Sequence, residues 1–208
     1  MSVQTKTLNN NIEMPELGYG VFRVEEGQEL VDAVKTAIKK GYRSIDTAAI
    51  YGNEESVGRG VNQAIEEGLV TRDELFITSK VWNDGLSYDE TIQAYETSLS
   101  KLGLEYLDLY LIHWPGDNKY QEPWKALEAL YKENRVRSIG VSNFQVNHLE
   151  DLRKNFEITP VINQIEFHPR LTQLEVRTYC EEHNIQVEAW SPLMAGELLN
   201  NETISAIA

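Results

Sequence analysis

The stretch LDLYLIHW, residues 107–114, is an apolar run that reaches a histidine, His113, and this pattern recurs along the chain. Four more apolar runs end in a polar or reactive side chain, at residues 44–46, 75–80, 138–143 and 161–164, and a sixth, at 185–190, ends in an aromatic one. In a parallel barrel the carboxyl ends of the strands point to one face, so side chains at these ends converge on one pocket. Contact between strand ends and water would explain one or two of these polar residues. An aspartate, a lysine, a histidine and an amide at successive ends indicate an enzyme.

Strands and helices alternate along the chain, which is typical of parallel βα units. Apolar residues at helical spacing predict helices at residues 27–40, 54–67, 87–102, 123–132, 145–154 and 172–182. A hairpin over residues 5–14 precedes them, and we expect it to plug the bottom of the barrel. The predicted fold class is α/β, a parallel (β/α)8 TIM barrel with an N-terminal β-hairpin.

The length of the chain does not match a closed barrel. Such a barrel usually takes about 250 residues, whereas this chain has 208 and shows only about seven βα units. Its last segment, residues 200–208, opens like a capped helix and has no Gly, Asn or basic last turn to end it. We therefore expect a single barrel domain over residues 1–208 that is incomplete at the C-terminus.

The composition, 41% hydrophobic and 25% charged, is that of an ordinary globular protein. With 33 acidic and 19 basic residues the formal net charge is −14, which repels nucleic acid and anionic membrane surfaces. The chain has one cysteine, Cys180, and shows neither a secretory leader nor an apolar run of bilayer length. We expect a cytoplasmic protein that binds neither nucleic acid nor a membrane.

Four residues near the strand ends form a candidate proton-relay site: Asp46, Tyr51, Lys80 and His113. A free tyrosine hydroxyl has a pKa of about 10, too high for efficient proton transfer near neutrality. The ammonium of Lys80 would lower this pKa, and the carboxylate of Asp46 would keep the lysine charged and in place. His113 would orient a substrate oxygen by a hydrogen bond. Singly, Asp46, Tyr51 and Lys80 each have an ordinary structural explanation; together the four residues favour catalysis.

Other chemistries lack support in the sequence. No set of His, Cys and acidic residues has the spacing of metal ligands, so we predict no metal. No GxGxxG motif follows a predicted strand, which argues against a Rossmann dinucleotide site. We interpret His168 as a structural histidine that holds a loop.

Six motifs, in order, give the chain a resemblance to a known family: GYRSIDTA at 41–48 with YGNE at 51–54, LDLYLIHWP at 107–115, IGVSNF at 139–144, NQIEFHP at 163–169 and WSPL at 190–193. They are similar to the signatures of the aldo-keto reductases. The resemblance extends from the first hairpin to about residue 199, and six spaced matches are far more specific than any one of them.

The resemblance implies a role for each matching residue. Tyr51 would protonate a carbonyl oxygen, Lys80 and Asp46 would tune it, and His113 would orient the substrate. Hydride would come from a reduced nicotinamide, usually NADPH in this family. Ser142, Asn143 and Gln164 match positions that hydrogen-bond the nicotinamide carboxamide, and Trp190 matches the aromatic residue that stacks on the ring.

A tryptophan at position 190 is similar to the bacterial diketogluconate and glyoxal or methylglyoxal reductases. We accordingly expect small aldehydes, ketoaldehydes or sugar-derived ketones as substrates. Phe22, Trp82 and Trp114 follow predicted strand ends and would wall a pocket that excludes water from the hydride path. For Trp114, ordinary packing at the barrel rim explains the position equally well.

The segment after the last predicted strand matches the family's pyrophosphate clamp, with Ser191, Pro192 and Leu193 as its first residues. The basic stretch that holds the 2′-phosphate of NADPH in the family follows an eighth strand, and this chain ends before it. The choice between NADPH and NADH is therefore open at this point.

The sequence as a whole predicts a monomeric, NADPH-dependent carbonyl reductase. One alternative is a cofactor-binding regulatory module with the same fold, as in the potassium-channel β subunits of the family. A second alternative is a truncated, inactive relic that keeps Asp46, Tyr51, Lys80 and His113 but cannot hold NADPH.

Overall fold

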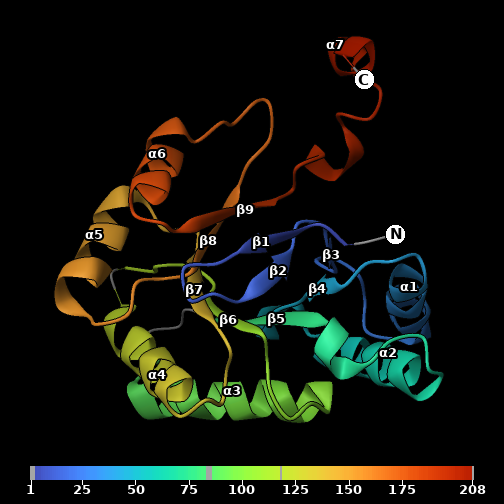
Figure 1. The fold of residues 1–208 in the computed structure, drawn as a ribbon, viewed down its shortest axis with the longest axis horizontal. Helices are drawn as coiled ribbons and strands as arrows, with labels where there is room; N and C mark the ends of the chain where they lie inside the picture. Colours follow the sequence, from blue (N-terminus) through green and yellow to red (C-terminus); the bar gives the residue numbers. More distant parts are fainter. Residues whose placement is uncertain (1–2, 83–85, 118, 208) are drawn as a thin grey trace.

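A computed structural model describes residues 3–82, 86–117 and 119–207. Within them, seven parallel strands form one curled sheet in the chain order β3-β4-β5-β6-β7-β8-β9 (Figure 1). The strands are β3 (Gly18–Gly20), β4 (Ser44–Asp46), β5 (Phe76–Val81), β6 (Leu109–Ile112), β7 (Ile139–Ser142), β8 (Ile162–Glu166) and β9 (Gln186–Trp190). The predicted α/β architecture is confirmed, and the described strands form a curled, open sheet with β3 and β9 at its edges.

Six helices connect successive strands and lie outside the curve of the sheet (Figure 1). They are α1 (Gln28–Lys39), α2 (Glu54–Glu66), α3 (Tyr88–Leu102), α4 (Gln121–Lys132), α5 (Val146–Asn155) and α6 (Leu174–Glu182). Each buries one apolar stripe against the strands, as Leu30, Val34 and Ile38 do in α1. The sequence placed all six helices correctly, with starts that differ by up to two residues.

Close backbone approach helps to position the helices. An added Cβ at Gly58 of α2 would lie 2.2 Å from the backbone oxygen of Leu102, the last residue of α3. Only glycine therefore allows α2 and α3 to pack at this distance. At its opposite end, α3 begins with a capping box between Ser87 and Glu90.

The register of the strands aligns their carboxyl ends. Asp46 of β4 pairs with Gly20 of β3 and Thr78 of β5, and Lys80 of β5 pairs with Leu111 of β6. All six residues of β5 are buried, as expected for a strand covered on both faces. This alignment brings polar side chains from separate strands to one end of the sheet.

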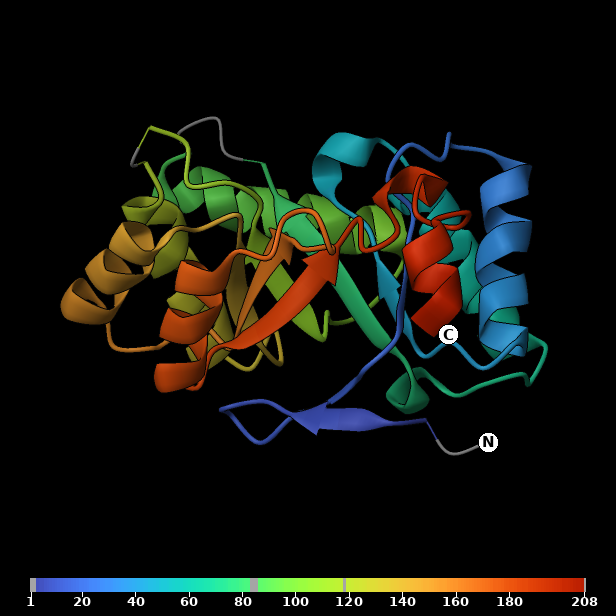
Figure 2. The same ribbon diagram turned by 90° about the horizontal axis from the view of Figure 1, so that it is seen from above.

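The predicted hairpin, β1 (Thr5–Thr7) with β2 (Glu13–Pro15), covers the opposite end (Figure 2). Leu8 and Met14 pack in one cluster with Phe76 and Leu109, the first residues of β5 and β6. The amide of Asn9 also donates to the oxygen of Pro160, ahead of β8, at 3.1 Å. The hairpin thus closes the amino-terminal end of the sheet, as predicted.

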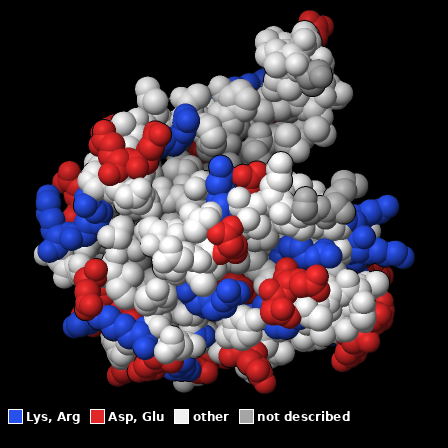
Figure 3. Space-filling view, in the orientation of Figure 1, with Lys and Arg blue, Asp and Glu red and all other residues white. Residues whose placement is uncertain are grey.

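After β9 the chain leaves the body of the molecule through α7 (Glu202–Ile207), whose residues are mostly exposed (Figure 1). Acidic and basic side chains are interspersed over the face shown in Figure 3, while the projecting segment is mostly uncharged. In the described part of the chain, no helix has both the length and the apolar character needed to cross a bilayer.

Candidate active site

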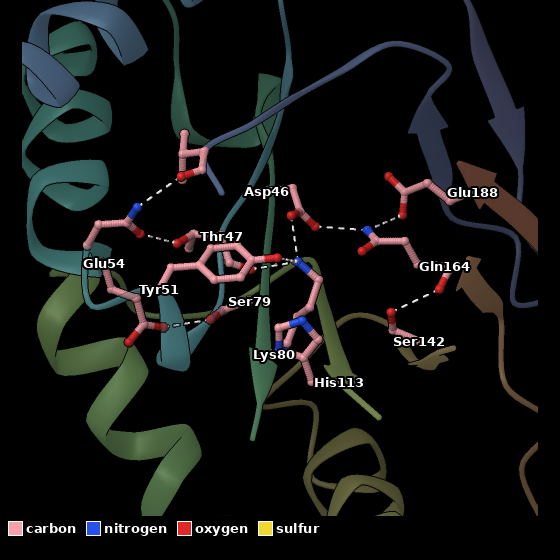
Figure 4. A network of polar contacts seen from close by, with 12 residues as sticks. Asp46, Thr47, Tyr51, Glu54, Ser79, Lys80, His113, Ser142, Gln164 and Glu188 are labelled. Carbon is pink, nitrogen blue, oxygen red and sulfur yellow. Dashed lines mark hydrogen bonds and ion pairs between the residues drawn. The ribbon is translucent and has the colours of Figure 1, made fainter. Parts of the chain in front are cut away.

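The four predicted proton-relay residues meet at the carboxyl end of the sheet (Figure 4). Asp46 ends β4, Lys80 lies near the end of β5, and His113 directly follows β6. Tyr51 ends the short 3-10 helix η1 (Ala49–Tyr51), which follows β4. The structure therefore brings together all four residues, as the sequence predicts.

The turn that carries Tyr51 is fixed by a buried asparagine. The side chain of Asn53 accepts a hydrogen bond from the Thr47 hydroxyl at 2.8 Å and donates to the backbone oxygens of Val21 and Val24 at 3.1 and 2.9 Å. Between Tyr51 and Asn53, Gly52 has φ of 68°, in the left-handed region that glycine adopts without strain. These contacts hold the phenol of Tyr51 over the end of β5.

Lys80 is fully buried, and its ammonium group lies close to three oxygen atoms. Its Nζ lies 2.5 Å from Asp46 Oδ1, 2.9 Å from the Thr47 oxygen and 3.5 Å from Tyr51 Oη. Burial lowers the pKa of Lys80, but Asp46, Tyr51 and Glu188 outweigh burial, so the pKa is raised overall. Lys80 is therefore a cation at neutral pH, with its positive charge next to the phenol.

The pKa of Tyr51 is shifted in the opposite direction from the expected one. Lys80 does lower the pKa of the phenol, but burial raises it more, so the pKa lies above its ordinary value of 10.0. The predicted lowering is thus wrong as a net effect, because the largest contribution is the removal of the phenol from water. Tyr51 is a neutral phenol near pH 7 and holds the proton that an acid must give.

His113 is nearly buried, and its ring packs edge-on against two aromatic rings. The ring centroids lie 5.6 Å from Tyr51 and 5.3 Å from Trp82. Burial, together with the charge of Lys80, lowers the pKa of His113 to about 3. The imidazole is therefore neutral at physiological pH, with one N–H to donate to a substrate oxygen.

The four residues predicted at the nicotinamide form one hydrogen-bonded chain. Ser142 Oγ donates to the backbone oxygen of Gln164 at 2.9 Å, and Asn143 Nδ2 donates to Ser142 Oγ at 3.0 Å. Trp190 Nε1 then donates to Asn143 Oδ1 at 2.9 Å. Asn143 has φ of 64°, a left-handed conformation that asparagine tolerates better than most residues. Its side chain also reaches the His113 oxygen at 3.0 Å, which links this chain to the proton-relay residues.

Two acidic residues of this region were not predicted from the sequence. Glu188 of β9 accepts a hydrogen bond from Gln164 Nε2 at 2.9 Å, and the same nitrogen donates to Asp46 Oδ2 at 2.9 Å. Behind β5, the buried Glu54 accepts from the Ser79 hydroxyl at 2.6 Å. A signal for Glu188 existed, because it lies two positions before Trp190 and so on the same face of the strand.

The remaining predicted residues lie at the rim. Phe22 is 60% exposed and its ring centroid lies 5.0 Å from that of Tyr51, while Trp114 is 41% exposed beside His113 in the chain. Ser191, Pro192 and Leu193 form the turn after β9, where Ser191 has φ of 53°. No hydrogen bond joins their side chains to Tyr51 or Gln164 within the described residues.

Other reactive side chains have structural surroundings. His168 contacts Glu166 at 3.2 Å and accepts from the Arg170 backbone N–H at 3.3 Å, which holds a loop after β8. Burial raises the pKa of the Cys180 thiol to about 11, so it is no nucleophile at neutral pH. Within residues 3–82, 86–117 and 119–207, no three His, Cys, Asp or Glu side chains are grouped to hold a metal ion.

The chain belongs to the aldo/keto reductase family, whose model matches residues 16–208. It is 65% identical over 202 residues to the uncharacterised oxidoreductase YtbE of Bacillus subtilis, covering 97% of this chain and 72% of that protein. It is 61% identical over 204 residues to a glyoxal reductase of the same organism, covering 98% of this chain and 72% of the relative.

Solved structures of the family have the same fold. An aldo/keto reductase from Brucella melitensis superimposes with a TM-score of 0.92 at 47% identity, covering all of this chain and 78% of that one. An aldo-keto reductase from Bombyx mori, in complex with NADP, gives a TM-score of 0.86 at 41% identity and covers 92% of this chain and 67% of the other.

Proposed function

We propose that this chain is an NADPH-dependent carbonyl reductase that converts small aldehydes, ketoaldehydes or sugar-derived ketones to alcohols. The observation that carries the proposal is the neutral phenol of Tyr51, 3.5 Å from the buried ammonium of Lys80. Family membership supports the reaction class, and the likeness to a glyoxal reductase supports the substrate class.

In the proposed reaction, a reduced nicotinamide supplies the hydride to the carbonyl carbon when it is bound. Tyr51 gives its proton to the carbonyl oxygen, so the step leaves an alcohol, the oxidised nicotinamide and a tyrosinate, which regains its proton from water before the next turnover. Lys80 stabilises the tyrosinate, because a positive charge close to it favours the ionised form. The neutral imidazole of His113 donates a hydrogen bond to the same oxygen and fixes its direction toward Tyr51.

The residues around Gln164 suit the carboxamide of a nicotinamide. A carboxamide offers two N–H donors and one acceptor oxygen, and the side-chain oxygen of Gln164 accepts no hydrogen bond from a described residue. Ser142 and Asn143 lie next to it, and Trp190 presents an aromatic ring at the end of β9. We therefore assign Ser142, Asn143, Gln164 and Trp190 to the cofactor, with Ser191, Pro192 and Leu193 toward its phosphates.

Aromatic side chains around Tyr51 favour a small substrate. Phe22 packs against Tyr51 and Trp82 packs against His113, and both would exclude water from the reacting carbonyl. Trp114 adds a further apolar surface at the rim. The proposed partner is a small carbonyl substrate, beside the cofactor, and a monomeric, cytoplasmic protein stays our prediction.

Loss of NADPH absorbance in the presence of methylglyoxal tests the proposal. We expect steady turnover by the purified chain, and a screen of carbonyl compounds with NADPH and NADH would define its substrates. A regulatory module would bind NADPH, as seen by quenching of tryptophan fluorescence, without turnover. An inactive relic would show neither quenching nor turnover, and either result would contradict the proposed function.

A further inference from the structure

Glu188 and Gln164 lie opposite each other on neighbouring strands. They are register partners in the parallel pair β8 and β9, so both side chains leave the sheet on its inner face. Gln164 Nε2 donates to Glu188 Oε2 and to Asp46 Oδ2, each at 2.9 Å (Figure 4). Because β4, which carries Asp46, is not adjacent to β8, this amide bridges the interior of the curled sheet.

The two hydrogen bonds determine which way the amide points. A primary amide has two N–H donors on nitrogen and an oxygen that only accepts. Both donors of Gln164 are directed at carboxylates, and rotation of the amide by half a turn would place its oxygen against two other acceptors. Figure 4 shows the amide oxygen turned away from Asp46 and Glu188. Asp46 alone would supply one of the two contacts, and Glu188 supplies the second.

We propose that Glu188 is a positioning residue that locks the amide of Gln164 with its oxygen free to accept a hydrogen bond from the nicotinamide carboxamide. This inference rests on the proposed function. In this proposal Glu188 acts through its hydrogen bond with Gln164 and needs no contact with the cofactor. The charged groups that face Glu188 are Asp46 from β4 and Lys80 from β5. Neither could take over from Glu188 as acceptor for Gln164, because Asp46 already accepts from both Gln164 and Lys80 and an ammonium only donates.

Two substitutions at position 188 distinguish loss of the hydrogen-bond acceptor from loss of the glutamate side chain as such. Glu188→Leu removes the acceptor, whereas Glu188→Gln keeps an amide oxygen that accepts from Gln164. We expect NADPH binding, measured by fluorescence quenching, to weaken about tenfold in Glu188→Leu, the effect of one hydrogen bond to a charged group, and about twofold or less in Glu188→Gln. The exposed Glu181 of α6 provides the matched control, and Glu181→Leu should bind as the unaltered chain does.

A second readout needs no cofactor. In NMR spectra of the protein alone, the side-chain NH₂ signals of Gln164, identified by their loss in Gln164→Leu, should exchange slowly with water. We expect exchange about tenfold faster in Glu188→Leu and little changed in Glu188→Gln. If the two variants behave alike in this measurement, the positioning role is wrong. If the protein binds no NADPH but the exchange rates differ as expected, the proposed function fails and the link from Glu188 to Gln164 stands.

Discussion

Carboxylates form part of charged clusters at both ends of the sheet, and the two clusters differ in their balance of charge. At the hairpin end, Asp108 accepts from Arg72 at 2.8 Å, from Arg137 at 2.7 Å and from the Ile77 backbone N–H at 2.8 Å. At the other end, two carboxylates, Asp46 and Glu188, lie near a single ammonium, that of Lys80, which forms an ion pair with Asp46. The cluster around Asp108 has more cations than anions, and the cluster around Lys80 has more anions than cations.

We relate the cluster around Asp108 to the stability of the fold and the cluster around Lys80 to the proposed reaction. Both oxygens of Asp108 have strong donors, and its fully buried side chain ties the start of β5 to residues before and after β6. Lys80, by contrast, is bonded closely to Asp46 and to the Thr47 oxygen but lies 3.5 Å from Tyr51. A phenolate formed at Tyr51 would draw this ammonium closer. Both oxygens of Asp108 are thus paired as they stand, whereas in the proposed reaction the charge at the other end would change when Tyr51 gives up its proton.

The largest expected effect comes from loss of the ammonium. Lys80→Met removes the charge that stabilises a tyrosinate, and we expect kcat for methylglyoxal to fall about 10³-fold, equivalent to about 4 kcal/mol in the barrier. Steady-state kinetics measure this change. Lys101→Met, at the exposed end of α3, should leave kcat unaltered. A Lys80→Met enzyme with near-normal kcat would remove the distinction between the two clusters.

The next largest effect lies at the hairpin end. Asp108→Asn leaves Arg72 and Arg137 without their buried partner, and we expect the free energy of unfolding to fall by about 3 kcal/mol. Urea denaturation measures the loss, and kcat of the folded fraction should stay unchanged. A large fall in kcat with unaltered stability would show that Asp108 belongs with the chemistry.

A smaller expected effect is a change of fold stability with pH that arises from Glu188. Burial, followed by the charge of Asp46, raises the pKa of Glu188 from 4.5 to about 7. A group with a raised pKa in the folded state stabilises the fold below its unfolded pKa, and this contribution is lost as the pH rises through the folded pKa. Because Glu188 keeps some contact with water on the edge strand β9, we expect a change of only about 1–2 kcal/mol between pH 5 and pH 8.

Denaturation of the chain and of Glu188→Gln at both pH values checks this expectation. The stability of Glu188→Gln relative to the unaltered chain should rise with pH, while Glu181→Gln should track the unaltered chain. A constant difference between Glu188→Gln and the unaltered chain would mean that Glu188 does not titrate in this range.

The order of the strands and the meeting of four reactive residues were predictable, because both follow from local patterns. Each strand is a short apolar run, and the parallel arrangement then fixes which ends come together. Helix starts were placed less accurately, because the local backbone conformation sets them. The helix α6, for example, begins at Leu174 after Gln173 adopts φ of 46°, two residues later than the pattern indicates.

Contacts between distant side chains could not be predicted in the same way. The bond from Trp190 to Asn143 joins residues 47 positions apart and depends on the conformations of both side chains. The net pKa of Tyr51 depends on burial against the attraction of Lys80, and sequence supplies only the second. Glu188 could have been found as a charge inside a predicted strand, but its two-donor partner Gln164 becomes visible only in three dimensions.

Single-turnover reduction of methylglyoxal by NADPH-loaded protein tests most directly whether Tyr51 is the proton donor. We predict that Tyr51→Phe binds NADPH as tightly as the unaltered chain does but reduces the carbonyl about 10³-fold more slowly, since its ring has no proton to give. Tyr131→Phe, a change on α4, should retain the normal rate. A normal rate of reduction in Tyr51→Phe would contradict the proposed role of Tyr51 and, with it, the account of the Lys80 cluster.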